Sequence, residues 1–166
     1  PARVLGSGTC GEASTWEFWS DGVLKIVGSG AMEDYAVKGS PWERYRTRIT
    51  TVEIGKDITY VGKFSFMMCN NLTNIIFEDG TVVETIGWGA FGYCSALKTV
   101  TIPATVKIID SYSFYESNKL TTVAFAEGSV LESIGMYAFW NDISLNTVKG
   151  MPENVVFGEG AFHNSG

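Results

Sequence analysis

A phenylalanine recurs along this chain at a nearly fixed interval, and this periodicity constrains the fold more than any other feature. Phe66, Phe91, Phe114, Phe139 and Phe162 are separated by 25, 23, 25 and 23 residues. Each closes a similar phrase, such as I-G-W-G-A-F or I-G-M-Y-A-F. A period of this length is typical of a solenoid, in which each repeat buries its apolar side only by stacking on the next. We therefore predict a stack of coils, and function becomes a question of which surface binds a partner.

The remainder of the repeat predicts a short strand and a turn. A leucine follows each of the first four phenylalanines after six residues, and pairs such as Ile75/Phe77 and Val100/Ile102 come next. Apolar residues two apart point to one side of a strand, and the β-branched content favours that conformation. The connector to the next phrase alternates between 7 and 9 residues, which is expected of a surface turn.

Two further positions of the repeat suggest tight geometry. The first holds glycine in four copies and aspartate in one, which predicts a left-handed corner; its residues are Gly62, Gly87, Asp110, Gly135 and Gly158. The second holds only small residues, which predicts close packing between coils; its residues are Ser65, Ala90, Ser113, Ala138 and Ala161.

The phrase L-x-x-V-x-[IF] followed by I-G-x-x-A-F-x-x-C-x-x-L resembles the BspA-like leucine-rich repeats of bacterial surface proteins. The opening of the chain resembles the same family through G-T-C-G, W-E-F-W-S-D-G-V-L-K-I, G-S-G-A-M and P-W-E-R-Y. The resemblance implies an α/β-type leucine-rich-repeat solenoid that is right-handed, with a single parallel β-sheet and short helical turns on the opposite side. It also implies a non-enzymatic protein, secreted or on the bacterial cell surface, that binds macromolecules. Asp110, Ser117, Asp142 and Gly150 depart from the repeat pattern.

The two ends of the chain differ from the repeats. Residues 1–48 do not fit the period and predict an N-terminal cap made of a β-hairpin, with its turn at Asp21-Gly22, and a short helix after Ser40-Pro41. Residues 49–166 hold about five repeats of alternating 23 and 25 residues. The last repeat stops after Phe162, so we expect the parent chain to continue, or the open end to be covered by another copy through self-association.

Composition excludes several classes of partner. The formal net charge of −6 disfavours nucleic acid and anionic membranes, and no apolar run approaches the ~18 residues of a membrane span. Three cysteines, too few and too widely spaced, do not predict a zinc site. We expect Cys69 and Cys94 to be buried thiols, although stacking leaves a disulfide open. His163 is the single histidine and acidic pairs suit turns, so we expect no catalytic residues, metal or cofactor.

Two surfaces remain as binding candidates. The first, which we call the strand face, comprises the outward side chains between the buried pairs, and it is the concave face of such repeats: Thr51, Glu53, Asn74, Ile76, Thr99, Thr101, Thr122, Ala124, Thr147 and Lys149. The second, which we call the aromatic stripe, surrounds the recurring phrase: Phe64, Trp88, Tyr93, Tyr112, Tyr115, Tyr137 and Trp140. Threonine also suits any solvated strand, and these aromatic rings could instead pack on neighbouring coils.

From these surfaces we expect an adhesion module that binds proteins of a host or neighbouring cell. The alternatives are a glycan-binding module that uses the aromatic stripe and an architectural stalk.

Overall fold

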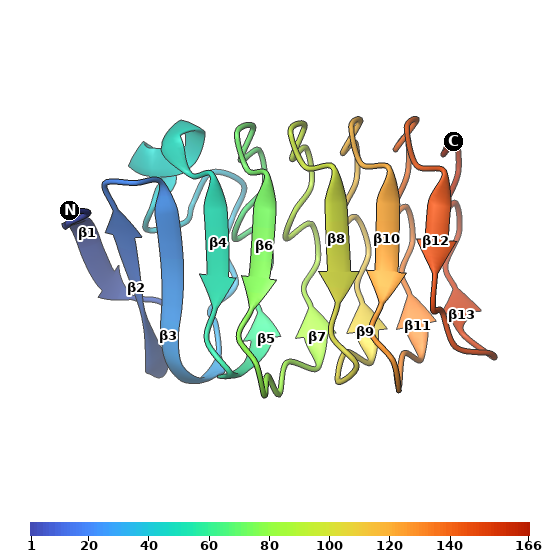
Figure 1. The fold of residues 1–166 in the computed structure, drawn as a ribbon, viewed down its shortest axis with the longest axis horizontal. Coiled ribbons are helices and arrows are strands. Elements are labelled where there is room, and N and C mark those ends of the chain that lie inside the picture. Colours follow the sequence, from blue (N-terminus) through green and yellow to red (C-terminus); the bar gives the residue numbers. More distant parts are fainter.

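The computed structural model describes all 166 residues as a right-handed solenoid whose coils follow one another along its long axis (Figure 1). Each coil contributes one strand to a front row and one strand to a back row, and after the first coil the back strand has only two residues. The front row comprises β4 (Thr51–Ile54), β6 (Asn74–Phe77), β8 (Thr99–Ile102), β10 (Thr122–Phe125) and β12 (Thr147–Lys149). The back row comprises β5 (Asp57–Val61), β7 (Thr85–Ile86), β9 (Ile108–Ile109), β11 (Ser133–Ile134) and β13 (Val156–Phe157).

The predicted solenoid is confirmed, and two of its details differ. The back row pairs in parallel from β5 to β13, so the coils carry a second parallel ladder in place of the predicted helical turns. The recurring aromatic phrase forms hydrogen-bonded turns and no helix. Three donors per coil bond to the carbonyls of the next coil, as Phe66 N–H does to Ala90 O at 2.8 Å. The backbone groups of these turns form hydrogen bonds with the neighbouring coil, whereas those of a helix form hydrogen bonds within the helix.

The first 48 residues form the expected hairpin with one additional strand. β1 (Val4–Thr9), β2 (Ala13–Trp19) and β3 (Val23–Ala31) are antiparallel neighbours, and a 3₁₀-helix, η1, covers Glu43–Arg48. β3 also begins both rows of the solenoid. Its first half pairs in parallel with β4 and its last residues pair with β5, with Gly28 at φ 95° between them. A residue without a side chain permits that change of direction.

The recurring phenylalanine forms a stacked spine through the interior. Phe66, Phe91, Phe114 and Phe139 are fully buried, and consecutive rings lie 5.1–5.5 Å apart at interplanar angles of 4–20°. Trp42, just before η1, continues the spine, because its ring stacks on Phe66 at 5.5 Å and 17°. Apolar side chains of both strand rows surround this spine, so the core runs unbroken through the coils.

The predicted left-handed corners are wrong in position. Gly62, Gly87, Gly135 and Gly158 do not have positive φ angles; a Cβ there would instead strike the neighbouring coil, as at Gly87, where it would lie 2.4 Å from Val61 O. The left-handed residues occupy two other positions of each coil. They are Phe64, Gly89, Tyr112, Tyr137 and Gly160, and then Met68, Tyr93, Glu116, Asn141 and Asn164. Glycine at the first position therefore reflects close approach of two backbones.

The small residues before each phenylalanine are buried as predicted, with Ala90, Ser113 and Ala138 at 0% exposure. All three cysteines are free and buried, so Cys69 and Cys94 are not bridged. The Cys94 thiol donates to the Phe66 carbonyl of the preceding coil at 3.4 Å, and Ser117 Oγ makes the equivalent bond to Phe91 O at 3.4 Å. Burial raises the pKa of Cys69 to about 12 and that of Cys94 as well, so both remain thiols.

Candidate functional site

The ten residues of the strand face form two rows across the front strands. Pairing aligns Thr99, Thr122 and Thr147 in one row and Thr101, Ala124 and Lys149 in the other. On the N-terminal side Thr51 aligns with Asn74, and Glu53 with Ile76. Because side chains alternate along a strand, these residues share the outward side, while their neighbours enter the core.

The front row is divided in the middle. β4 pairs with β6, and β10 pairs with both β8 and β12, but β6 and β8 are not paired. Figure 1 shows the wider gap between β6 and β8. Behind it the back row is continuous, since β7 pairs with β9 in register. The coils are therefore joined at the back and splayed at the front, and we call this opening the seam.

Pro103 accounts for one end of the seam. In three other coils the residue after the front strand donates its N–H to the preceding strand: Gly55 to Ile26 O, Glu78 to Ile54 O and Ala126 to Ile102 O, at 2.8–3.0 Å. Pro103 occupies this position after β8 and has no N–H to donate. The Phe77 carbonyl at the end of β6 therefore lacks the hydrogen bond that the carbonyls of Ile26, Ile54 and Ile102 receive. Proline is confined to strand edges for this reason.

Lys98 accounts for the other end. A threonine hydroxyl before the front strand donates to the preceding coil at Thr50, Thr73 and Thr121, with distances of 3.1–3.4 Å. Lys98 replaces that threonine before β8 and has no hydroxyl. Its backbone N–H also makes no bond to Thr73 O, whereas Thr73 and Thr121 each donate theirs to the preceding coil. Two substitutions in one coil thus remove a hydrogen bond at each end of the same strand pair.

The seam exposes apolar surface. Ile75 and Phe77 are half-buried, although the equivalent Val52 and Ile54 of β4 are fully buried. Ile76, on the outward side, is 40% exposed. A hollow of about 450 Å³ opens over the seam between the end of β6 and Thr101, Pro103 and Ala104. A second of about 430 Å³ lies beside it over the middle of β3 and the ends of β4 and β6.

Carboxylates border these hollows. Glu78 and Asp79 line both hollows, and Glu53 lines the second, where Lys25 is the single basic residue of the lining. Glu78 is fixed in place because its Oε2 accepts the backbone N–H of Lys56 at 2.9 Å. The surface at the seam is therefore apolar at its floor and acidic at its border. Residue periodicity alone did not indicate Glu78, Asp79 or Pro103; comparing connectors position by position would have singled out Pro103.

The aromatic stripe is also assembled by the fold, but its rings lie mainly against one another. Tyr115 stacks on Trp140 at 5.0 Å and 10°, and Tyr112 meets Tyr137 edge-on at 5.5 Å and 64°. These four rings line a small hollow of about 150 Å³. Trp88 packs on Tyr112 at 4.5 Å, and the Lys63 ammonium lies 5.4 Å from the Trp88 ring. Six of the seven stripe residues are half-buried, and Tyr93 is 39% exposed.

Groups with catalytic potential are dispersed. His163 stacks on Trp140 at 6.3 Å, away from the buried cysteines. No three His, Cys, Asp or Glu side chains lie close enough together to hold a metal ion. None of the helices has the length and apolar character needed to cross a bilayer.

Known protein structures with similar folds are bacterial repeat proteins. A leucine-rich cell surface protein of Faecalibacterium prausnitzii is 24% identical with a TM-score of 0.69, covering 96% of this chain and 46% of that protein. The pneumococcal vaccine antigen PcpA is 20% identical with a TM-score of 0.64, covering 98% and 48%. A leucine-rich-repeat protein of Eubacterium ventriosum is 20% identical with a TM-score of 0.51, covering 95% and 63%. The chain thus spans less than two thirds of each of these proteins.

A comparison with curated proteins finds no match. The family described as BspA type leucine rich repeat region matches residues 44–166 in six copies. This match covers the coils and most of η1 and includes every repeat identified from the phenylalanine period. The chain therefore belongs to the BspA-type leucine-rich-repeat family.

Proposed function

We propose that this chain is a non-catalytic module that binds an extracellular protein through its strand face. The observation that carries the proposal is the seam: it places apolar side chains and two adjoining hollows in the middle of a face whose other side chains are mostly polar. Aligned strands hold these residues in fixed register, so a partner meets a preorganised surface. Exposed apolar groups with a polar surround are a common feature of protein-binding surfaces.

Export to the bacterial surface fits the family. The F. prausnitzii relative is described as a cell surface protein and PcpA as a vaccine antigen. Because the chain spans only part of these proteins, the surface location and the adhesive role are proposed for this module alone.

The aromatic stripe supports glycan binding as a second candidate. A hollow lined only by Tyr112, Tyr115, Tyr137 and Trp140 offers the ring surface that sugars contact. The stacking of Tyr115 on Trp140 weighs against this candidate, because one face of each ring is already covered. Protein binding through the strand face is therefore the function that the geometry supports better.

Binding to an array of extracellular-matrix proteins and glycans tests the proposal. The Thr99→Glu/Thr122→Glu variant places charges on the strand face, and Tyr112→Ala/Tyr137→Ala removes two rings of the aromatic stripe. We expect protein binding that is lost only in the threonine variant. Glycan binding lost only in the tyrosine variant would favour the second candidate, and no binding to either class would favour the architectural stalk. Circular dichroism of each variant controls for folding.

A further inference from the structure

We infer that the seam between β6 and β8 is the point at which an extended, basic segment of the partner protein docks. This inference rests on the proposed function and specifies the partner's chemistry. Three features of the seam carry it: backbone groups without their usual partners, an apolar floor and an acidic border. Each can be matched to one kind of group on the partner.

The backbone groups call for hydrogen-bond donors. The Phe77 carbonyl lacks a donor because residue 103 is proline, and the Thr73 carbonyl receives none from Lys98. Both groups lie on the β6 side of the seam, whereas the β3/β4, β4/β6 and β8/β10 junctions are closed by hydrogen bonds at both positions. Peptide N–H groups or the guanidinium of an arginine would satisfy them. Unpaired strand edges bind extended segments for this reason.

The two hollows fit long side chains of the partner that have an apolar stem. The two hollows of about 450 and 430 Å³ share one wall, formed by Ile76, Phe77, Glu78 and Asp79. Alternate side chains of an extended segment point to one side about 7 Å apart, so neighbouring hollows suit residues two apart. The aliphatic part of arginine or lysine covers apolar surface such as Ile76 while its charged head remains near water.

The border determines the charge of the segment. Glu78 and Asp79 border both hollows and Glu53 borders one, opposed by Lys25 alone. The whole chain carries a net charge of −6, which attracts a basic segment from a distance. An acidic segment would be repelled by the same three carboxylates.

Closing the seam tests the inference without damaging the fold. The Lys98→Thr/Pro103→Ala variant restores the hydroxyl and the N–H found at these positions in other coils. We expect it to have a higher urea midpoint than the wild type, because two hydrogen bonds are gained. We expect it to bind a fluorescein-labelled heptapeptide of alternating arginine and valine at least about fivefold more weakly.

Two variants that each remove one carboxylate at the same position of the connector test the electrostatic contribution. Asp79→Asn removes a carboxylate at the seam, whereas Glu127→Gln removes the exposed carboxylate at the equivalent position two coils away. Fluorescence anisotropy should give weaker binding of the arginine peptide with Asp79→Asn and unchanged binding with Glu127→Gln. A matching peptide of alternating glutamate and valine should not bind.

The outcomes separate the inference from the proposed function. Equal binding of the arginine peptide by the wild type and the seam-closing variant would overturn the inference, as would equal effects of Asp79→Asn and Glu127→Gln. Array proteins could bind to the wild type and to Lys98→Thr/Pro103→Ala but not to Thr99→Glu/Thr122→Glu. In that case the strand face binds its partner without the seam. If no array protein binds while the peptide result holds, the proposed extracellular partner is wrong and the peptide site remains.

Discussion

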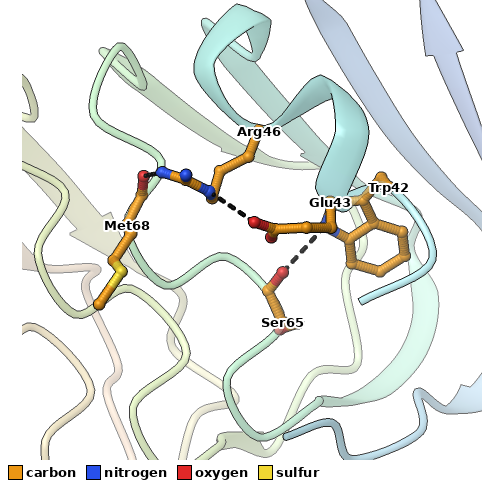
Figure 2. A network of polar contacts seen from close by, with 5 residues as sticks. All are labelled: Trp42, Glu43, Arg46, Ser65 and Met68. Carbon is orange, nitrogen blue, oxygen red and sulfur yellow. Dashed lines mark hydrogen bonds and ion pairs between the residues drawn. The ribbon is translucent and has the colours of Figure 1, made fainter. Parts of the chain in front are cut away.

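The indole N–H of Trp42 donates a hydrogen bond of 2.9 Å to the Ser65 carbonyl (Figure 2), while the Trp42 ring stacks on Phe66. In later coils the equivalent carbonyls, such as Ala90 O, accept a backbone N–H from the preceding coil. No coil precedes the first, and Trp42 supplies both the missing donor and the missing ring. Arg46, held by Glu43 at 2.9 Å, donates to Met68 O at 2.8 Å beside it. The N-terminal segment thus reproduces the contacts of a coil with side chains.

Replacing Trp42 separates these two contributions. Trp42→Phe retains an aromatic ring against Phe66 but leaves the buried Ser65 carbonyl without a partner, so we expect a loss of about 1–3 kcal/mol in the free energy of unfolding. Trp42→Ala also creates a cavity and should cost about 3–5 kcal/mol. Urea denaturation measures both. Trp88→Phe is the matched control, since the Trp88 indole has no protein acceptor; a Trp42→Phe variant as stable as this control would refute the hydrogen-bond role.

Asp142 is a buried carboxyl in a row that otherwise holds thiols and hydroxyls. It occupies the position of Cys94 and Ser117 and is 0% exposed. Its Oδ1 accepts the Ser117 N–H at 2.7 Å, whereas Oδ2 has no partner. Burial raises the pKa of Asp142 to about 9, outweighing the Ser117 hydrogen bond that lowers it. The folded protein therefore carries a proton here at neutral pH.

This proton predicts a stability that falls as pH rises. Unfolded aspartate has a pKa of about 3.9, so between that pH and about 9 unfolding releases the proton. The free energy of unfolding should then lose about 1.4 kcal/mol per pH unit across this window through Asp142 alone. Asp142→Ser should remove this slope and stabilise the protein at pH 8, as measured by urea unfolding from about pH 5 to 8. Asp79→Asn, at an exposed carboxylate, serves as the control; an unchanged slope in Asp142→Ser would contradict the assignment.

The sequence period predicted most of the coil, because burial repeats with it. The phenylalanine spine, the front strands and the small residues beside Phe91 all follow from positions that recur in every repeat. The back-row strands could not be predicted in this way, because a strand of two residues such as Thr85–Ile86 is too short to show an alternating pattern. The recurring glycine led to an incorrect prediction, because glycine is found both where the backbone is left-handed and where two backbones approach closely. Gly87 is of the second kind.

The seam escaped prediction for a different reason. It arises where two residues, Lys98 and Pro103, depart from the repeat, and each departure alone reads as ordinary variation. Only the hydrogen bonds of the other coils reveal that both positions donate to the preceding strand. A period identifies what coils share, whereas this candidate site depends on how one coil differs.

The buried thiols predict chemical inertness in the folded protein. The thiolate is the reactive form, and burial raises the pKa of Cys10, Cys69 and Cys94. We expect no reaction of native protein with Ellman's reagent at pH 8 and reaction of all three thiols in denaturant. Lys119→Cys, which places a thiol at an exposed position, should react at once and serves as the positive control. Rapid labelling of native wild-type protein would contradict the burial of these residues.

Ala90 tests how closely the coils approach one another. Its side chain is 0% exposed, and its carbonyl accepts the Phe66 N–H of the preceding coil at 2.8 Å, so a larger side chain must push two coils apart. We expect Ala90→Leu to cost about 1–3 kcal/mol or more, which for a domain of this size lowers the melting temperature by roughly 3–10 °C. Ala124→Leu adds the same atoms to the half-buried strand face and should change the melting temperature little. A near-wild-type melting temperature for Ala90→Leu would mean that the coils separate at little cost, and the small residues at this position would then need another explanation.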